Sequence, residues 1–193
     1  MQPTVPGIRL RPRSATLGRV FRIGLGVLAV AISAQVALPL GFTPIPFTLQ
    51  PLAVILVGAV LGPVEGAATL TAYLCLGALG APVFAGGGGG VLRLLGPTGG
   101  YLLAFPVAAA VAGYARSRTP QRPMPASVRA FLAMTVSMAI IHLGGVSQLA
   151  ILGGDPSLAF RYGFLPFFIG DLVKVAIATA ILALGASRLS ALR

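Results

Sequence analysis

Long runs of hydrophobic residues alternate along the chain with short segments that are basic or rich in proline and glycine. A helix needs about 20 mainly apolar residues to cross a bilayer, and most of these runs approach that length. The pattern therefore predicts an all-α integral membrane protein with six transmembrane helices in one bundle. The six predicted spans cover residues 23–40, 50–62, 64–80, 98–115, 128–152 and 164–187.

Three connections between the predicted spans have an unusual composition. Residues 39–47 hold three prolines, which exclude a regular helix and predict an extended, apolar loop. Residues 82–97 contain five consecutive glycines, whose backbone can approach a ligand closely and expose its N–H groups. Residues 153–163 begin with Gly-Gly-Asp-Pro, which predicts a turn.

Composition agrees with a membrane protein. Of the 193 residues, 56% are hydrophobic and 9% are charged, and the mean hydropathy is +0.95. Soluble domains carry about 25% charged residues. We divide the chain into a basic cytoplasmic tail, residues 1–22, and a six-helix substrate-binding domain, residues 23–193. The first span is interpreted as an uncleaved helix and not as a signal peptide, because further spans follow it. The single cysteine excludes a disulfide framework and a cysteine metal cluster, and we expect no cofactor.

The net charge of +11 is explained better by membrane orientation than by nucleic-acid binding. Eleven of the thirteen arginines lie in the amino-terminal tail, in residues 116–129 or at the carboxyl end. Positive residues favour the cytoplasmic side, so we predict cytoplasmic termini and a multi-pass protein of the cell membrane. The loops 39–47, 82–97 and 153–163 then share the outer side.

The last predicted span carries an acid and a base three residues apart, Asp171 and Lys174. In a helix these positions share one face. Ionisable groups are costly in the bilayer core, so they face the protein interior and often mark a substrate path. In the alternative, structural interpretation, the two side chains neutralise each other and fix the packing of the helix.

Two other residues are candidates for ligand contacts. Arg93 is the only charged residue between Glu65 and Arg116. It could meet an anionic group held against the glycine-rich loop, or it could extend to lipid headgroups. His142 could contact a ligand or respond to pH, although a satisfied interior histidine is the more common case. One acid, two bases and exposed backbone amides together suit a small amphiphilic anion.

Several other functions find no support in the sequence. The glycine-rich loop lacks the Gly-Lys-Ser/Thr of a phosphate-binding loop. No spacing is typical of a nucleophile with its base, of paired acids or of a metal site, so we do not predict an enzyme. Without a nucleotide-binding motif, active uptake would need an energising partner or another gradient.

Small residues in the first predicted span, Gly26, Ala29 and Ser33, are spaced to form a smooth stripe. Such stripes let another helix approach closely. The approaching helix could belong to a partner protein or to this chain.

Several segments together resemble the BioY family, which comprises the biotin-binding S components of energy-coupling factor (ECF) transporters. The resemblance covers about residues 20–187. The segments that carry it are residues 37–50, 58–63, 80–90, 96–101 and 170–174.

The resemblance implies a six-helix S component with biotin bound near the outer face. The family's charged binding positions correspond to Arg93, Asp171 and Lys174. Further carried-over binding positions are Gln50, Gly88 and Tyr101. The resemblance also implies that the first helix docks through Gly26, Ala29 and Ser33 onto a transmembrane coupling protein, which carries two cytoplasmic ATPases. It leaves open that the chain works as a homo-oligomer without such partners. The long arginine-rich tail departs from the family, and we assign it to orientation.

Two alternatives to a biotin subunit remain at this stage. One is an S component for another small vitamin, and the other is a membrane scaffold that recruits a partner without transporting anything. Removal of the Arg93 or Asp171 side chain distinguishes a scaffold from a transporter, because a scaffold should keep its partner whereas a transporter should lose its ligand.

Overall fold

The computed structural model describes residues 13–116 and 125–191, and most of these residues are helical. Residues 1–12 of the predicted basic tail, residues 117–124 of the basic segment 116–129, and the last two residues lie outside the described part. Each of the six predicted spans corresponds to one long helix. These helices are α1 (Arg13–Gln35), α2 (Gln50–Leu61), α3 (Pro63–Ala78), α5 (Gly99–Gly113), α6 (Ala126–Gly153) and α8 (Phe168–Ala191).

Shorter elements occupy the connections. They are β1 (Ala37–Leu38), β2 (Phe47–Thr48), η1 (Ala85–Gly87), α4 (Val91–Leu95), η2 (Tyr114–Arg116) and α7 (Pro156–Gly163). β1 and β2 pair antiparallel, with Leu38 opposite Phe47, and close the base of the proline-rich loop. That loop contains no helix, as its prolines predicted.

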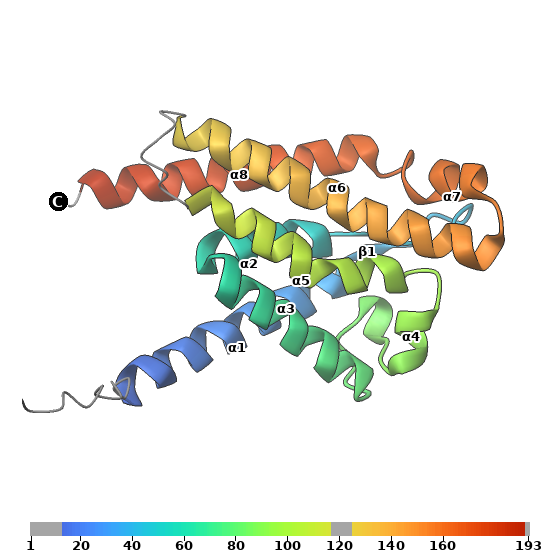
Figure 1. Ribbon diagram of the computed structural model, residues 1–193, viewed down its shortest axis with the longest axis horizontal. Helices are drawn as coiled ribbons and strands as arrows, with labels where there is room; N and C mark the ends of the chain where they lie inside the picture. Colours follow the sequence, from blue (N-terminus) through green and yellow to red (C-terminus); the bar gives the residue numbers. More distant parts are fainter. Residues whose placement is uncertain (1–12, 117–124, 192–193) are drawn as a thin grey trace, which may run out of the picture.

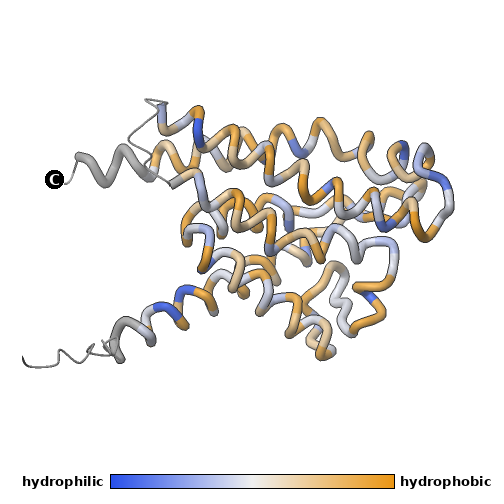
Figure 2. The backbone as a smooth tube through the Cα atoms, in the orientation of Figure 1, coloured by the Kyte–Doolittle hydropathy of each residue, from blue (hydrophilic) through white to orange (hydrophobic). Residues whose placement is uncertain are grey.

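Within the described ranges, three helices are long and apolar enough to cross a membrane, over Thr16–Gln35, Ala126–Gly153 and Phe168–Gly185. α2 and α5 are apolar but shorter. Figure 2 shows hydrophobic residues along most of each helix, with hydrophilic positions more frequent toward the two ends of the bundle. Many large apolar side chains lie on the outside, including Leu28, Leu143 and Ile169. A surface of this kind is suited to lipid rather than to water.

The helix α5 lies at the centre of the bundle and packs against α6, α3 and α2. Close approach depends on glycine at these contacts. Gly58 of α2 and Gly66 of α3 both face the backbone of Ala109 in α5, and Gly144 of α6 faces the backbone of Gly100. A side chain at any of these positions would push two helices apart.

The breaks between helices follow from local sequence. Gly62 has φ of +88°, a conformation that favours glycine, and it separates α2 from α3, which begins at Pro63. α6 ends at Gly153 and is capped by Gly154, which is in the left-handed conformation. The segment that we expected to be a turn, 153–163, instead contains α7. Its N-cap is Asp155, whose Oδ1 accepts hydrogen bonds from the backbone of Ser157 at 2.8 Å and Leu158 at 3.0 Å.

The chain crosses the molecule repeatedly, so its connections gather at two opposite ends. In Figure 1, β1, α4 and α7 lie at the right-hand end. The start of α1, the carboxyl end of α8 and the start of α6 lie at the left-hand end. All three unusual loops are therefore at one end of the bundle, as the alternation of spans predicted.

Candidate functional site

A cavity of about 360 Å³ opens among the loops at the right-hand end of Figure 1 and the adjacent ends of the helices. Its volume lies in the usual range for small-molecule sites, about 300–1,000 Å³. The wall is mainly apolar, with a few polar groups. Of the side chains that the sequence selected, the wall includes Gln50, Arg93, Tyr101, Asp171 and Lys174.

The first two turns of α8 supply two of the charged groups. Lys174 Nζ lies 2.8 Å from Asp171 Oδ1, and both residues are only 4% exposed. The predicted shared helix face is therefore observed, and the pair lines the cavity. This geometry serves both interpretations, because the two charges neutralise each other and are also positioned beside the cavity.

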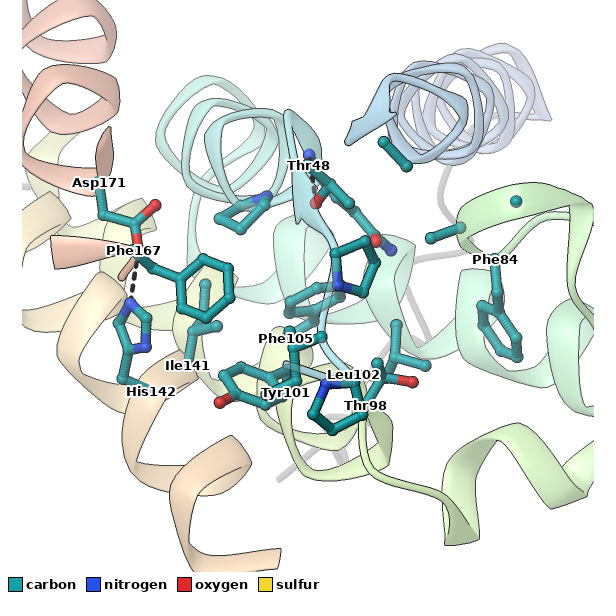
Figure 3. A pocket seen from close by; sticks show the side chains of 18 of the residues that line it. Thr48, Phe84, Thr98, Tyr101, Leu102, Phe105, Ile141, His142, Phe167 and Asp171 are labelled. Atoms are coloured by element: carbon teal, nitrogen blue, oxygen red, sulfur yellow. Dashed lines mark hydrogen bonds and ion pairs between the residues drawn. The ribbon is translucent and has the colours of Figure 1, made fainter. Parts of the chain in front are cut away.

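His142 of α6 is the residue that sequence reasoning underestimated. Its Nε2 lies 2.6 Å from the second oxygen of Asp171, Oδ2 (Figure 3). It is 7% exposed and lines the same cavity. The interpretation as a satisfied interior histidine holds for Nε2, whose partner is the central acid of the site, but not for Nδ1, which is buried without a hydrogen-bond partner among the described residues. The sequence contained no signal for this contact, because it depends on how α6 is rotated against α8.

Phe47 was also missed. Its ring lies under the ammonium group of Lys174, with Nζ 3.9 Å from the ring centroid, and this contact stabilises the cation. Phe47 also stacks on Phe167, with centroids 6.3 Å apart. The ring of Phe47 fits because Gly170, one turn before Lys174 in α8, has no side chain to obstruct it. The glycine before Asp171 thus has a packing function.

Arg93 lies in α4 and reaches the cavity across the glycine-rich loop. Its guanidinium covers Gly88 so closely that a Cβ there would be 2.8 Å from Nε. Gly88 itself is not among the residues that line the cavity, so its contribution is to leave space for Arg93. Within the described residues, the guanidinium of Arg93 has no hydrogen bond or ion pair.

Gln50 and Tyr101 line the cavity, and hydrogen bonds to other parts of the protein fix the orientation of their side chains. Gln50 Nε2 donates to Tyr73 Oη at 2.7 Å, and Tyr73 donates to the carbonyl of Val83 at 2.8 Å. Tyr101 donates to the carbonyl of Gly163 at 2.7 Å and thereby links α5 to α7. The amide oxygen of Gln50 remains without a partner among the described residues.

The glycine-rich loop is held from two sides. Gln35, at the end of α1, accepts from the backbone N–H of Gly87 at 3.0 Å and donates to the carbonyl of Phe84 at 3.3 Å. Phe84 packs on Gly77 of α3, where a Cβ would be only 2.7 Å from ring atom Cε2. The loop is therefore a fixed wall of the cavity, on the opposite side from Asp171 in Figure 3.

The sequence left open whether the small residues of α1 face a partner or this chain, and their surroundings differ. Gly26 is buried, and a Cβ there would lie 2.8 Å from Thr69 Cγ2 of α3. Ser33 is half-buried and its hydroxyl donates to Val30. Ala29 is exposed. The intramolecular interpretation is therefore right for Gly26, and docking remains a prediction for the exposed face around Ala29.

Among the described residues, no group of three histidine, cysteine, aspartate or glutamate side chains is arranged to hold a metal ion. The polar groups of the cavity are instead suited to an organic ligand that has both an anionic group and N–H or C=O groups.

Comparison with known proteins places these features in a family. A family model described as the BioY family matches residues 9–191. The chain is 42% identical over 159 residues to the probable biotin transporter BioY of Pyrococcus horikoshii, covering 82% of this chain and 90% of the relative. It is 37% identical over 164 residues to the biotin transporter BioY of Thermotoga maritima, covering 84% and 92%.

One solved structure has a closely similar fold, the S-component for biotin from an ECF-type ABC transporter. The TM-score is 0.77, and the match covers 89% of this chain and 92% of that chain. Sequence identity is 23%, so this match bears on the fold alone.

Proposed function

Because this chain belongs to the BioY family, we propose that it is a membrane subunit that binds biotin and mediates its uptake into the cell. The observation that carries the proposal is the cavity of about 360 Å³, whose polar side chains are placed to bind the two ends of a small amphiphilic anion. A buried acid with two partners lies on one side, and a cation without a partner reaches in beside the glycine-rich loop.

The arrangement of charges favours one orientation of the ligand. Lys174 is already paired with Asp171 at 2.8 Å and contacts the ring of Phe47, whereas Arg93 has no ion pair among the described residues. The ligand carboxylate therefore pairs with Arg93. The ureido ring lies toward Asp171, whose carboxylate has lone pairs left to accept from its N–H groups. Lys174 is placed to donate to the ureido carbonyl.

The surrounding residues supply shape. Tyr101 and Phe167 give an apolar wall for the ring system and the aliphatic chain. Gln50 adds one acceptor, since its amide nitrogen already donates to Tyr73. Gly88 acts indirectly, by leaving space for the Arg93 side chain.

All six long helices cross the cell membrane in this proposal, with both termini in the cytoplasm and the cavity near the outer face. The distribution of arginines supports this orientation, because among the described residues the start of α1, η2 and the start of α6, which carry Arg19, Arg22, Arg116 and Arg129, lie at the end away from the cavity. Residues 1–22 form the basic cytoplasmic tail, and residues 23–193 form the binding domain.

Uptake against a gradient needs an energy source. The sequence contains no recognisable nucleotide-binding motif that could supply it. We assign that role to a transmembrane coupling protein with two cytoplasmic ATPases, docked on the exposed face of α1 that includes Ala29. Self-association of this subunit is the alternative arrangement. Co-purification of the coupling protein with the wild type, and its loss on Ala29→Leu, would distinguish the first from the second.

Calorimetric titration of the purified protein in detergent tests the central claim. We expect saturable binding of biotin and none of thiamine or riboflavin. Binding of either competitor in place of biotin would indicate a different vitamin. If well-folded protein bound none of the three, the chain would be better explained as a membrane scaffold.

A further inference from the structure

His142 has one ring nitrogen with a partner and one without. Nε2 contacts Asp171 Oδ2 at 2.6 Å, but Nδ1 is buried and has no hydrogen-bond partner among the described residues. The side chain is only 9% exposed. A buried polar atom without a partner costs about 1–3 kcal/mol, so its presence at a cavity wall needs an explanation.

The charges around the imidazole determine which form of it fits. Asp171 is already balanced by Lys174, which lies 2.8 Å from its other oxygen. A protonated His142 would add a positive charge that no buried acid compensates, which is expensive in a site of low dielectric constant. The neutral ring with its proton on Nε2 donates to Asp171. Nδ1 then carries a lone pair and is an acceptor.

The residues around Nδ1 leave this acceptor without a partner. Three aromatic rings surround the imidazole, with centroids 5.0 Å away for Phe164, 6.1 Å for Tyr101 and 6.4 Å for Phe167. Tyr101 is the one with a hydroxyl, and that group already donates to Gly163. Figure 3 shows the second nitrogen of His142 on the side toward Tyr101 and Ile141, away from Asp171.

We propose that Nδ1 of His142 accepts a hydrogen bond from a ureido N–H of the ligand, which makes His142 a specificity-determining residue. This rests on the proposed function, because it takes biotin as the ligand. A cyclic urea has two N–H donors and one carbonyl. His142 and Asp171 each accept from one donor, and Lys174 donates to the carbonyl. Phe167, which lines both the cavity and the imidazole, shifts its ring to admit the ligand to Nδ1.

Nuclear magnetic resonance can test this directly, because His142 is the only histidine of the chain. Protein labelled with ¹⁵N-histidine should show one imidazole with a protonated Nε2 and an unprotonated Nδ1. On addition of biotin, the Nδ1 resonance should move in the direction expected for a new accepted hydrogen bond. Saturable binding with an unchanged Nδ1 resonance would overturn the inference and leave the proposed function intact. Absence of biotin binding by folded protein would overturn both.

Two variants of His142 and two analogues of biotin show whether His142 recognises the ligand or only supports Asp171. His142→Gln keeps an amide near the Nε2 position but has no acceptor at the Nδ1 position, so biotin should bind about 2- to 12-fold more weakly. His142→Asn keeps an acceptor near Nδ1 and gives up the bond to Asp171. Two biotin analogues, each methylated at one ureido nitrogen, then report which donor is read.

In the wild type and in His142→Asn, both analogues should bind more weakly than biotin, because each analogue loses one of the two ureido N–H donors. In His142→Gln the loss should shrink for one analogue, the one methylated at the nitrogen that contacts His142, because that acceptor is gone. If both analogues lost as much affinity in His142→Gln as in the wild type, His142 would merely support Asp171, and the inference would be overturned.

Discussion

Lys174 lies 2.8 Å from Asp171 within one turn of α8, and each residue is 4% exposed. Two opposite charges in so dry a place stabilise each other, but their removal from water is costly. A pair of this kind adds little net stability over an apolar pair. Its retention in an otherwise hydrophobic helix is therefore best explained by what the charges do for a ligand.

Neutralising one member of this pair should be more damaging to stability than neutralising both. Asp171→Leu leaves Lys174 as an uncompensated buried cation and should destabilise the protein by about 3–5 kcal/mol. Asp171→Leu combined with Lys174→Met removes both charges and should recover most of that loss. Thermal unfolding in detergent measures the stabilities.

Biotin binding should follow a different pattern in the same three proteins. The double variant should remain without measurable binding in calorimetry even though its stability is recovered. Recovery of binding together with stability would mean that the pair has a packing function only, which is the structural alternative for these residues.

Arg93 should read the carboxylate of the ligand. A charge-assisted hydrogen bond contributes about 1.5–3 kcal/mol, so Arg93→Ala should weaken biotin binding about 10- to 150-fold. Biotin methyl ester carries no negative charge, so Arg93→Ala should change its affinity little. Arg161→Ala is the matched control, because Arg161 is an exposed arginine of α7 that does not line the cavity.

If Arg93→Ala weakened the acid and the ester equally, Arg93 would support the loop and not the carboxylate. If it weakened neither, the alternative in which this side chain extends to lipid headgroups would be right.

The six long helices were predictable because each contains a mainly apolar run with a glycine or proline near its end. The sequence did not predict α7 because Gly-Gly-Asp-Pro is typical of a turn, although Asp155 followed by Pro156 is also a typical helix start. The extended character of residues 39–47 followed from the restrictions that proline imposes on the backbone, and these do not depend on tertiary context.

The charged part of the site was predictable for a different reason. Buried charges are rare in a membrane helix, so Asp171 and Lys174 stand out in the sequence. His142 and Phe47 do not, because their contacts depend on the rotation of α6 and on the course of a loop. Gly26 shows the same limit, since a small residue on α1 can face another helix of the chain as easily as a partner.

The contact between α2 and α5 depends on Gly58. A Cβ at this position would lie 2.7 Å from the Cα of Ala109, and backbone atoms cannot move aside as a flexible side chain can. Gly58→Ala should therefore destabilise the protein by about 1–3 kcal/mol. Gly24→Ala is the matched control, because a Cβ on Gly24 of α1 has open space around it. The two apparent melting temperatures in detergent should differ, with Gly24→Ala equal to or above the wild type, and equal values would contradict the close packing.

The orientation of the chain can be tested with two serines on either side of α6, a helix of 28 residues and so about 40 Å long. Ser127 lies in its first turn and Ser157 in the following α7, and both are exposed. In a Cys75→Ala background, a membrane-impermeant maleimide should label Ser157→Cys on intact cells. It should label Ser127→Cys only after the membrane is disrupted, because the positive-inside rule places that end in the cytoplasm. The reverse pattern would show that the cavity faces the cytoplasm, where it could not bind biotin from outside the cell.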